Sequence, residues 1–113
     1  MDTALWKAKV KTGKESLARE WVSFLKKNKE EGEKTLANEK EYLEIYFISE
    51  EKGVTYLYMF VMAEDLEYAN KVASESKNPM DAKHFEYMSL CLDEKDWIRI
   101  DPELILRSNI QFQ

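Results

Sequence analysis

The stretch YLEIYFISEEKGVTYLYMFVM, residues 42–62, contains two apolar-rich runs separated by a charged, glycine-containing break. Runs of β-branched and aromatic residues bounded by turn residues are typical of a β-hairpin, and the turn is expected at residues 49–53. A sheet with one solvated face carries polar residues on that face. Both runs instead place large apolar or aromatic side chains on both faces. The hairpin therefore predicts a sheet that is covered on both sides.

Outward from the hairpin, the patterns predict two strand–helix–strand units. Residues 3–11 alternate as a strand does, and Thr12 and Glu15 match a capping box before apolar positions at helical spacing. Gly32 is expected to end or kink that helix, with a short helical piece over 33–40. The later elements are expected as a helix within 63–76, a helix starting at Asn78-Pro79, a strand over 97–100, a helical turn after Asp101-Pro102 and an extended tail over 107–113.

The order of these elements predicts a ferredoxin-like βαββαβ fold of the α+β class. Its four-stranded antiparallel sheet would carry both main helices on one face. Tyr46, Tyr58, Phe60 and Met62, left in water on the other face, would form a larger apolar patch than soluble monomers usually carry. The simplest way to cover this face of the sheet is a second copy of the chain, related by a two-fold axis. We therefore expect a homodimer through the sheet faces, a dimeric α/β barrel whose lumen would hold a small molecule.

Composition excludes several other classes of protein. The chain has 113 residues, which fits a single domain over 1–113, and its 22 acidic and 17 basic residues give a net charge of -5. Without a basic stripe, neither nucleic acid nor an anionic membrane is expected as a partner. Cys91 is the sole cysteine, so no disulfide or Cys-rich metal site is expected. The amino-terminal residues have no apolar signal-like run, and a cytoplasmic location is expected.

The candidate ligand-binding residues follow from the expected lumen. Glu44 would point into it, accompanied by Tyr46 and Tyr58 and by Lys7 and Arg99 from the outer strands. A buried carboxylate is costly unless it is paired or hydrogen-bonded, so its presence among tyrosines suggests a binding cavity. The alternative is that Glu44 lies near a sheet edge in water.

His84 is the only histidine, and three interpretations of it stay open. It is a packed structural residue, a proton-transfer group or an axial ligand of haem. Asp81 is expected to cap its helix or to orient His84. Glu39 and Glu41 are expected as solvated charges, although Glu39, Glu44 and His84 together would supply a general acid and base. No metal or cofactor motif is present, so no cofactor is expected.

Three segments carry a resemblance to a known family: TGKESLAREW (12–21), TLANEKEYLEIYFI (35–48) and NPMDAKHFEYM (78–88). The chain resembles a bacterial family of unknown function that is similar in fold to the dimeric α/β-barrel superfamily. That superfamily includes antibiotic-biosynthesis monooxygenases, sugar mutarotases and haem-degrading monooxygenases. The resemblance implies a ferredoxin-like homodimer, and no catalytic signature of those enzymes can be placed on residues of this chain.

Two functions of different classes are therefore expected. The first is a homodimer that binds a small metabolite in a sheet-lined cavity. The second is a cofactor-independent enzyme, either an isomerase-type proton shuttle like a mutarotase or a monooxygenase, with Glu44 and His84 as catalytic residues. Convergence of Glu44, a tyrosine hydroxyl and His84 in an open cavity would favour catalysis.

Overall fold

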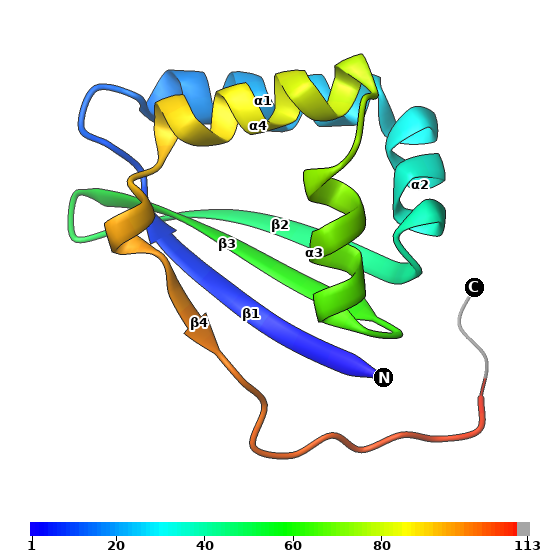
Figure 1. The fold of residues 1–113 in the computed structure, drawn as a ribbon. Coiled ribbons are helices and arrows are strands. Elements are labelled where there is room, and N and C mark those ends of the chain that lie inside the picture. Colours follow the sequence, from blue (N-terminus) through cyan, green and yellow to red (C-terminus); the bar gives the residue numbers. More distant parts are fainter. Residues whose placement is uncertain (111–113) are drawn as a thin grey trace.

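The computed structural model describes residues 1–110 and contains a four-stranded antiparallel sheet with four α-helices on one side (Figure 1). The strand order β2-β3-β1-β4 is that of the ferredoxin-like fold, which confirms the predicted fold class. The elements are β1 (Asp2–Lys9), α1 (Glu15–Lys27), α2 (Lys29–Asn38), β2 (Glu41–Glu51), β3 (Val54–Ala63), α3 (Leu66–Ser74), α4 (Pro79–Cys91), a 3-10 turn (Glu94–Asp96) and β4 (Ile98–Ile100).

The helices form two groups over the sheet. Figure 1 shows α1 and α4 side by side across the top, whereas α2 and α3 stand near one end of the sheet. Within the described residues 1–110, no helix has both the length and the apolar character that a membrane span would need.

Two of the predicted helix boundaries were wrong. Helix α1 is preceded by Lys14, whose side chain makes no cap, and only Glu15 reaches back, accepting from the Gly13 N–H at 2.7 Å. Gly32 lies inside α2, and the break comes at Asn28, whose side-chain amide donates to the Phe24 carbonyl at 2.8 Å. The amide of Asn28 competes with the helical pattern at that point, which a glycine-centred interpretation misses.

Other local signals were read correctly. Asn78 caps α4 by accepting from the Met80 N–H at 2.8 Å, with Pro79 at the first helical position. Strand β4 forms where predicted.

The helical turn predicted after Asp101-Pro102 does not form, and residues 101–110 are irregular. The last three residues of the tail predicted over 107–113 lie outside the described residues, and 107–110 form no strand.

The register of the hairpin shows that the predicted assignment of side chains to the two faces of the sheet was wrong for Glu44 and Tyr46. Its turn is the two-residue Lys52-Gly53, both with positive φ (53° and 80°), as the tight hairpin turns require. With this turn, Glu44 pairs with Val61 and Tyr46 pairs with Met59. Glu44 and Tyr46 therefore face the helices, not the lumen expected on the opposite side. A one-residue difference in turn length moves a strand's side chains to the other face.

The sheet face away from the helices, the outer face, is nevertheless rich in apolar side chains. Four of them are among the exposed large hydrophobic residues of the protein, with exposed fractions from 42% for Ile45 to 56% for Ile98. Register places the following residues on this face: Leu5, Lys7, Leu43, Ile45, Phe47, Tyr56, Tyr58, Phe60, Met62, Ile98 and Ile100.

The buried core on the helix side is divided into two clusters. The larger lies beneath α1 and α4 and includes Trp21, Leu57 and Cys91. The smaller lies beneath α3 and includes Val61 and Leu66. The space between these clusters is where the candidate site lies.

Candidate functional site

A cavity of about 610 Å³ separates the two core clusters, between the sheet and the helices. Its volume falls within the range typical of small-molecule sites, roughly 300–1,000 Å³. Its polar lining includes Glu39, Glu41, Glu44, Tyr46, Asp81 and His84. Its apolar lining includes Trp6, Leu25, Leu36, Met59, Val61, Leu66, Met80, Phe85 and Met88. The cavity therefore combines apolar walls with one polar side, the arrangement that small-molecule sites share.

Backbone irregularity at the start of β2 brings three carboxyl groups to the polar side. Glu41 and Glu44 are three residues apart, so simple alternation would put them on opposite faces. A bulge between Glu41 and Leu43 adds one residue to β2, and both glutamates turn toward the helices. Lys40, with a φ of 56°, turns the chain just before the strand and leaves Glu39 beside them.

The three carboxyl groups form a tight cluster. One oxygen from each of Glu39, Glu41 and Glu44 lies within 4.8 Å of the other two. Burial raises the pKa of Glu41, and its hydrogen bond to Glu39 and the charge of Glu44 raise it further. Burial also raises the pKa of Glu39, while its hydrogen bond with Glu41 acts in the opposite direction. The cluster therefore holds a shared proton at neutral pH, with Glu41 as its carrier.

Tyr46 connects the carboxyl cluster to the aromatic part of the cavity. Its hydroxyl donates to the Glu44 carboxylate at 2.6 Å. Burial and the neighbouring charge of Glu44 raise the pKa of Tyr46, so this hydroxyl stays protonated and remains a donor. The ring lies edge-on to both Trp21 and His84, with centroids 6.3 Å away in each case.

His84 is held in one tautomer by Trp21, a fully buried residue of α1. The indole N–H of Trp21 donates to His84 Nδ1 at 2.8 Å, so the neutral ring carries its proton on Nε2. Burial lowers the pKa of His84, although the charges of Glu44 and Asp81 act in the opposite direction. His84 is therefore a neutral hydrogen-bond donor near pH 7.

Asp81 is buried and stabilises the start of its own helix, α4. It is 7% exposed and accepts a hydrogen bond from the Ser76 hydroxyl at 2.5 Å. It therefore ties the α3–α4 connection to the first turn of α4, and its charge faces both Glu39 and His84. The helix-start role predicted for Asp81 fits this contact.

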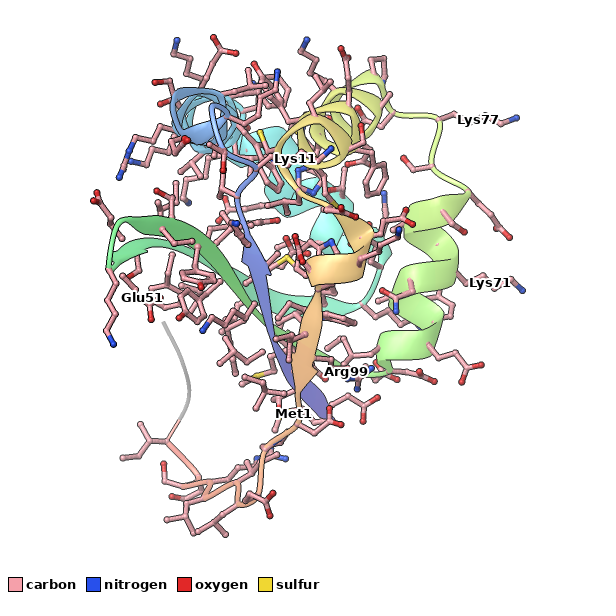
Figure 2. The ribbon with its side chains drawn as sticks, turned by 90° about the vertical axis from the view of Figure 1, so that its left-hand side faces the viewer. Met1, Lys11, Glu51, Lys71, Lys77 and Arg99 are labelled. Atoms are coloured by element: carbon pink, nitrogen blue, oxygen red, sulfur yellow. The ribbon has the colours of Figure 1, made fainter. Side chains whose placement is uncertain are left out.

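The cationic side chains that line the cavity, Lys29 and Arg99, are already paired at its rim. Lys29 forms an ion pair with Glu33 at 2.9 Å, and Arg99 forms one with Asp101 at 2.8 Å. Figure 2 shows Arg99 beside β4, at the edge of the sheet. Of the ion pairs found over residues 1–110, none includes Glu39, Glu41 or Glu44.

The structure brings together only some of the predicted site residues. Glu44, Tyr46, His84 and Arg99 all line the cavity, whereas Lys7 and Tyr58 lie on the outer face and are separated from it by the sheet. There the Tyr58 hydroxyl donates to Glu51 at 2.7 Å, and the Lys7 ammonium lies over the Tyr56 ring, 4.4 Å from its centroid. Four of the six predicted site residues therefore share one cavity, and Lys7 and Tyr58 lie apart from it.

The sequence interpretation missed two contributions to the site. Glu39 and Glu41 were expected in water, yet Glu39 is only 8% exposed and both line the cavity. The hydrogen bond that Trp21 donates to His84 was not predicted either. Three glutamates within six residues were a visible signal, but alternation alone could not place them together.

This arrangement can do two kinds of chemistry. A carboxylic acid, carboxylates and a neutral imidazole around one cavity can bind a polar group and can also pass protons to and from it. The three carboxyl oxygens are also close enough to share one hard cation, since such cations prefer oxygen ligands.

Comparison with known proteins gives a family and a fold. The model of a family described as "Family of unknown function (DUF6176)" matches residues 1–110. No curated protein matches the chain.

Three solved structures are similar over most of the chain. Protein Atu4242 from Agrobacterium tumefaciens aligns with a TM-score of 0.61 and 11% identity, covering 98% of this chain and 100% of that one. A NIPSNAP domain protein from Burkholderia xenovorans, described as uncharacterized, aligns with a TM-score of 0.55 and 12% identity. This alignment covers 96% of this chain and 100% of that one. A "Putative monooxygenase" from Fusobacterium nucleatum aligns with a TM-score of 0.55 and 16% identity, covering 88% of this chain and 42% of that one. At these identities the similarity shows the fold alone.

Proposed function

The chain belongs to the DUF6176 family of unknown function, and we propose that it is a homodimer that binds a small molecule in the cavity between its sheet and its helices. The observation that carries this proposal is the cavity of about 610 Å³, whose polar side is a cluster of three carboxyl groups.

The energetic cost of the polar side supports a binding role. Carboxylates removed from water destabilise a protein unless donors compensate them. Tyr46 gives one donor to Glu44, and one proton is shared by Glu39 and Glu41. A cluster kept for stability alone would need more partners than these, and a ligand with hydrogen-bond donors would supply them.

The outer face supports the homodimer. Phe47 is 50% exposed and Ile98 is 56% exposed, at opposite edges of this face. Its centre is apolar and aromatic, while Lys7 and Glu51 place opposite charges among the tyrosines. A two-fold axis allows such a surface to bind its own copy, since each charge can then meet its opposite on the partner. The homodimer would cover the outer face and leave the cavity on the helix side.

Methionine methyl groups provide a test of the cavity. Met59, Met80 and Met88 line it, whereas Met62 lies on the outer face. We expect 1-hexanol and hexylamine to shift the NMR signals of the three cavity methyl groups in a saturable way and to leave Met62 unchanged. If neither probe shifted the cavity methyl groups, the proposed binding function would be wrong.

A specific observation favours proton transfer as a second function. Glu44, the Tyr46 hydroxyl and His84 line the same cavity, and Glu41 is protonated beside them. Such a set can protonate one oxygen of a sugar while deprotonating another, as mutarotation requires. We expect faster exchange between aldose anomers, measured by NMR, and loss of the acceleration in His84→Gln. Exchange no faster than in buffer for a panel of aldoses would exclude this activity.

A further inference from the structure

We propose that the cavity selects an organic cation, a molecule with a primary ammonium group on an apolar body. This inference rests on the proposed binding function and specifies its ligand class. The ammonium group would lie among Glu39, Glu41 and Glu44, and the apolar body would lie against Met59, Phe85 and Met88.

The charge of the cavity favours a cation. Three carboxyl groups that share one proton leave about two negative charges, and His84 adds no positive charge because its pKa is lowered by burial. Asp81 adds a further carboxyl group near Glu39. Figure 2 shows the nearby lysines Lys71 and Lys77 pointing away from the molecule.

Glu39 provides a second, independent observation. This side chain is 8% exposed and lines the cavity, yet no N–H or O–H donor from the rest of residues 1–110 bonds to it, apart from the proton shared with Glu41. Glu39 lines this cavity and the smaller one beside it, and its carboxyl group has Glu41 as its hydrogen-bond partner among the described residues.

The number of donors on an ammonium group matches the cluster. A primary ammonium carries three N–H donors and no acceptor. Three carboxyl oxygens within 4.8 Å of one another can surround such a group, each accepting one hydrogen bond. Charge-assisted hydrogen bonds of this kind are stronger than those between neutral groups.

The apolar walls favour an organic cation over a metal ion. A metal ion would occupy only a small part of about 610 Å³ and would leave the walls formed by Leu36, Met59 and Met88 unused. Phe85 and Tyr46 add aromatic rings, whose faces attract organic cations. An alkyl or aryl body would exclude water from these walls, and affinity would increase with the apolar area that it buries.

Binding of a cation would also release a proton. An ammonium group favours the ionised carboxylate, so it lowers the pKa of Glu41 and displaces the proton shared with Glu39. The affinity would therefore increase with pH, as long as the amine itself stays protonated.

Isothermal titration of the full chain tests this selectivity with four probes: hexylamine, 1-hexanol, hexanoate and Mn²⁺. We expect hexylamine to bind at least about tenfold more tightly than 1-hexanol, because hydrogen bonds to charged groups are worth more than neutral ones. Hexanoate should give no binding heat. Titration of hexylamine in buffers of different ionisation enthalpy should show proton release.

Two isosteric variants separate the roles of the carboxyl groups. Glu44→Gln removes one negative charge and should weaken hexylamine binding at least about tenfold. Glu41→Gln replaces the protonated acid by a group that cannot ionise, so it should abolish proton release and remove the increase of affinity with pH. Glu103→Gln, in the exposed segment after β4, should change neither. A cooperative thermal unfolding transition and well-dispersed methionine methyl signals would show that each variant is folded.

The outcomes distinguish the failure of this inference from the failure of the binding function. If 1-hexanol bound as tightly as hexylamine, or if Mn²⁺ bound and hexylamine did not, the cavity would be a binding site but the ligand class would be wrong. If no probe shifted the methyl groups of Met59, Met80 and Met88, both proposals would be wrong.

Discussion

Replacement of Glu41 by glutamine should change how the stability of the protein depends on pH. Burial raises the pKa of Glu41 above its ordinary value of 4.5, so between about pH 5 and pH 8 the folded state keeps a proton that the unfolded state has lost. Stability conferred by a retained proton is complete below the unfolded pKa and decreases as pH rises. Glutamine mimics the protonated acid and cannot lose a proton, so this decrease should disappear.

The magnitude follows from the number of protons retained. One proton changes the free energy of unfolding by about 1.4 kcal/mol per pH unit, or about 4 kcal/mol between pH 5 and pH 8. Glu41 is only half-buried and water in the cavity screens it, so we expect about half of that value. Glu41→Gln should match the wild type at pH 5 and be about 2 kcal/mol more stable at pH 8. The lowered pKa of His84 has the opposite pH dependence, but it is present in both proteins and cancels in the comparison.

Urea unfolding at half-unit pH steps, followed by tryptophan fluorescence at one fixed protein concentration, measures this difference. Trp21 is fully buried and reports on the core. Glu103→Gln serves as the matched control, because it removes a carboxyl group from an exposed segment. If the wild type and Glu41→Gln gave parallel curves of stability against pH, Glu41 would not carry the shared proton, and the electrostatic description of the cluster would be wrong.

Three further substitutions test other parts of the structure. Tyr46→Phe removes the 2.6 Å hydrogen bond to Glu44 and should lower the free energy of unfolding by about 1–2 kcal/mol, and equal urea midpoints would contradict this. Trp21→Phe removes the donor to His84 Nδ1, so ¹⁵N NMR should change from one imidazole tautomer to a mixture; an unchanged spectrum would argue against the assigned bond. Phe47→Lys should weaken the homodimer at least about tenfold in analytical ultracentrifugation, whereas Tyr68→Lys on α3 should not, and equal dissociation constants would exclude the outer face as the interface.

The fold was predictable because its signals are local. The Asn78-Pro79 helix start, the alternation in residues 3–11 and the two apolar runs of the hairpin each follow from nearby residues. Their order then leaves few topologies, since short connections and right-handed crossovers exclude most of the others. The helix break at Asn28 was missed because a side-chain amide, not the more conspicuous Gly32, ends α1.

The site was only partly predictable because it depends on register. Whether Glu44 faces the helices or the outer face depends on the length of one turn, and the sequence between residues 49 and 53 permits more than one length. The bulge after Glu41 then reverses the alternation for a single residue, which no periodicity reveals. Glu44, Tyr46 and His84 line one cavity, but it lies between the sheet and the helices and not on the face where the lumen was expected.

A crystal structure of the protein soaked with a brominated alkylamine would show where an organic cation binds, because the anomalous signal of bromine locates the ligand. We predict a peak on the helix side of the sheet, beside Met59, Phe85 and Met88, with the amine directed at Glu39 and Glu44. A peak between two outer faces, or no peak in a crystal where the cavity is open to solvent, would contradict the account.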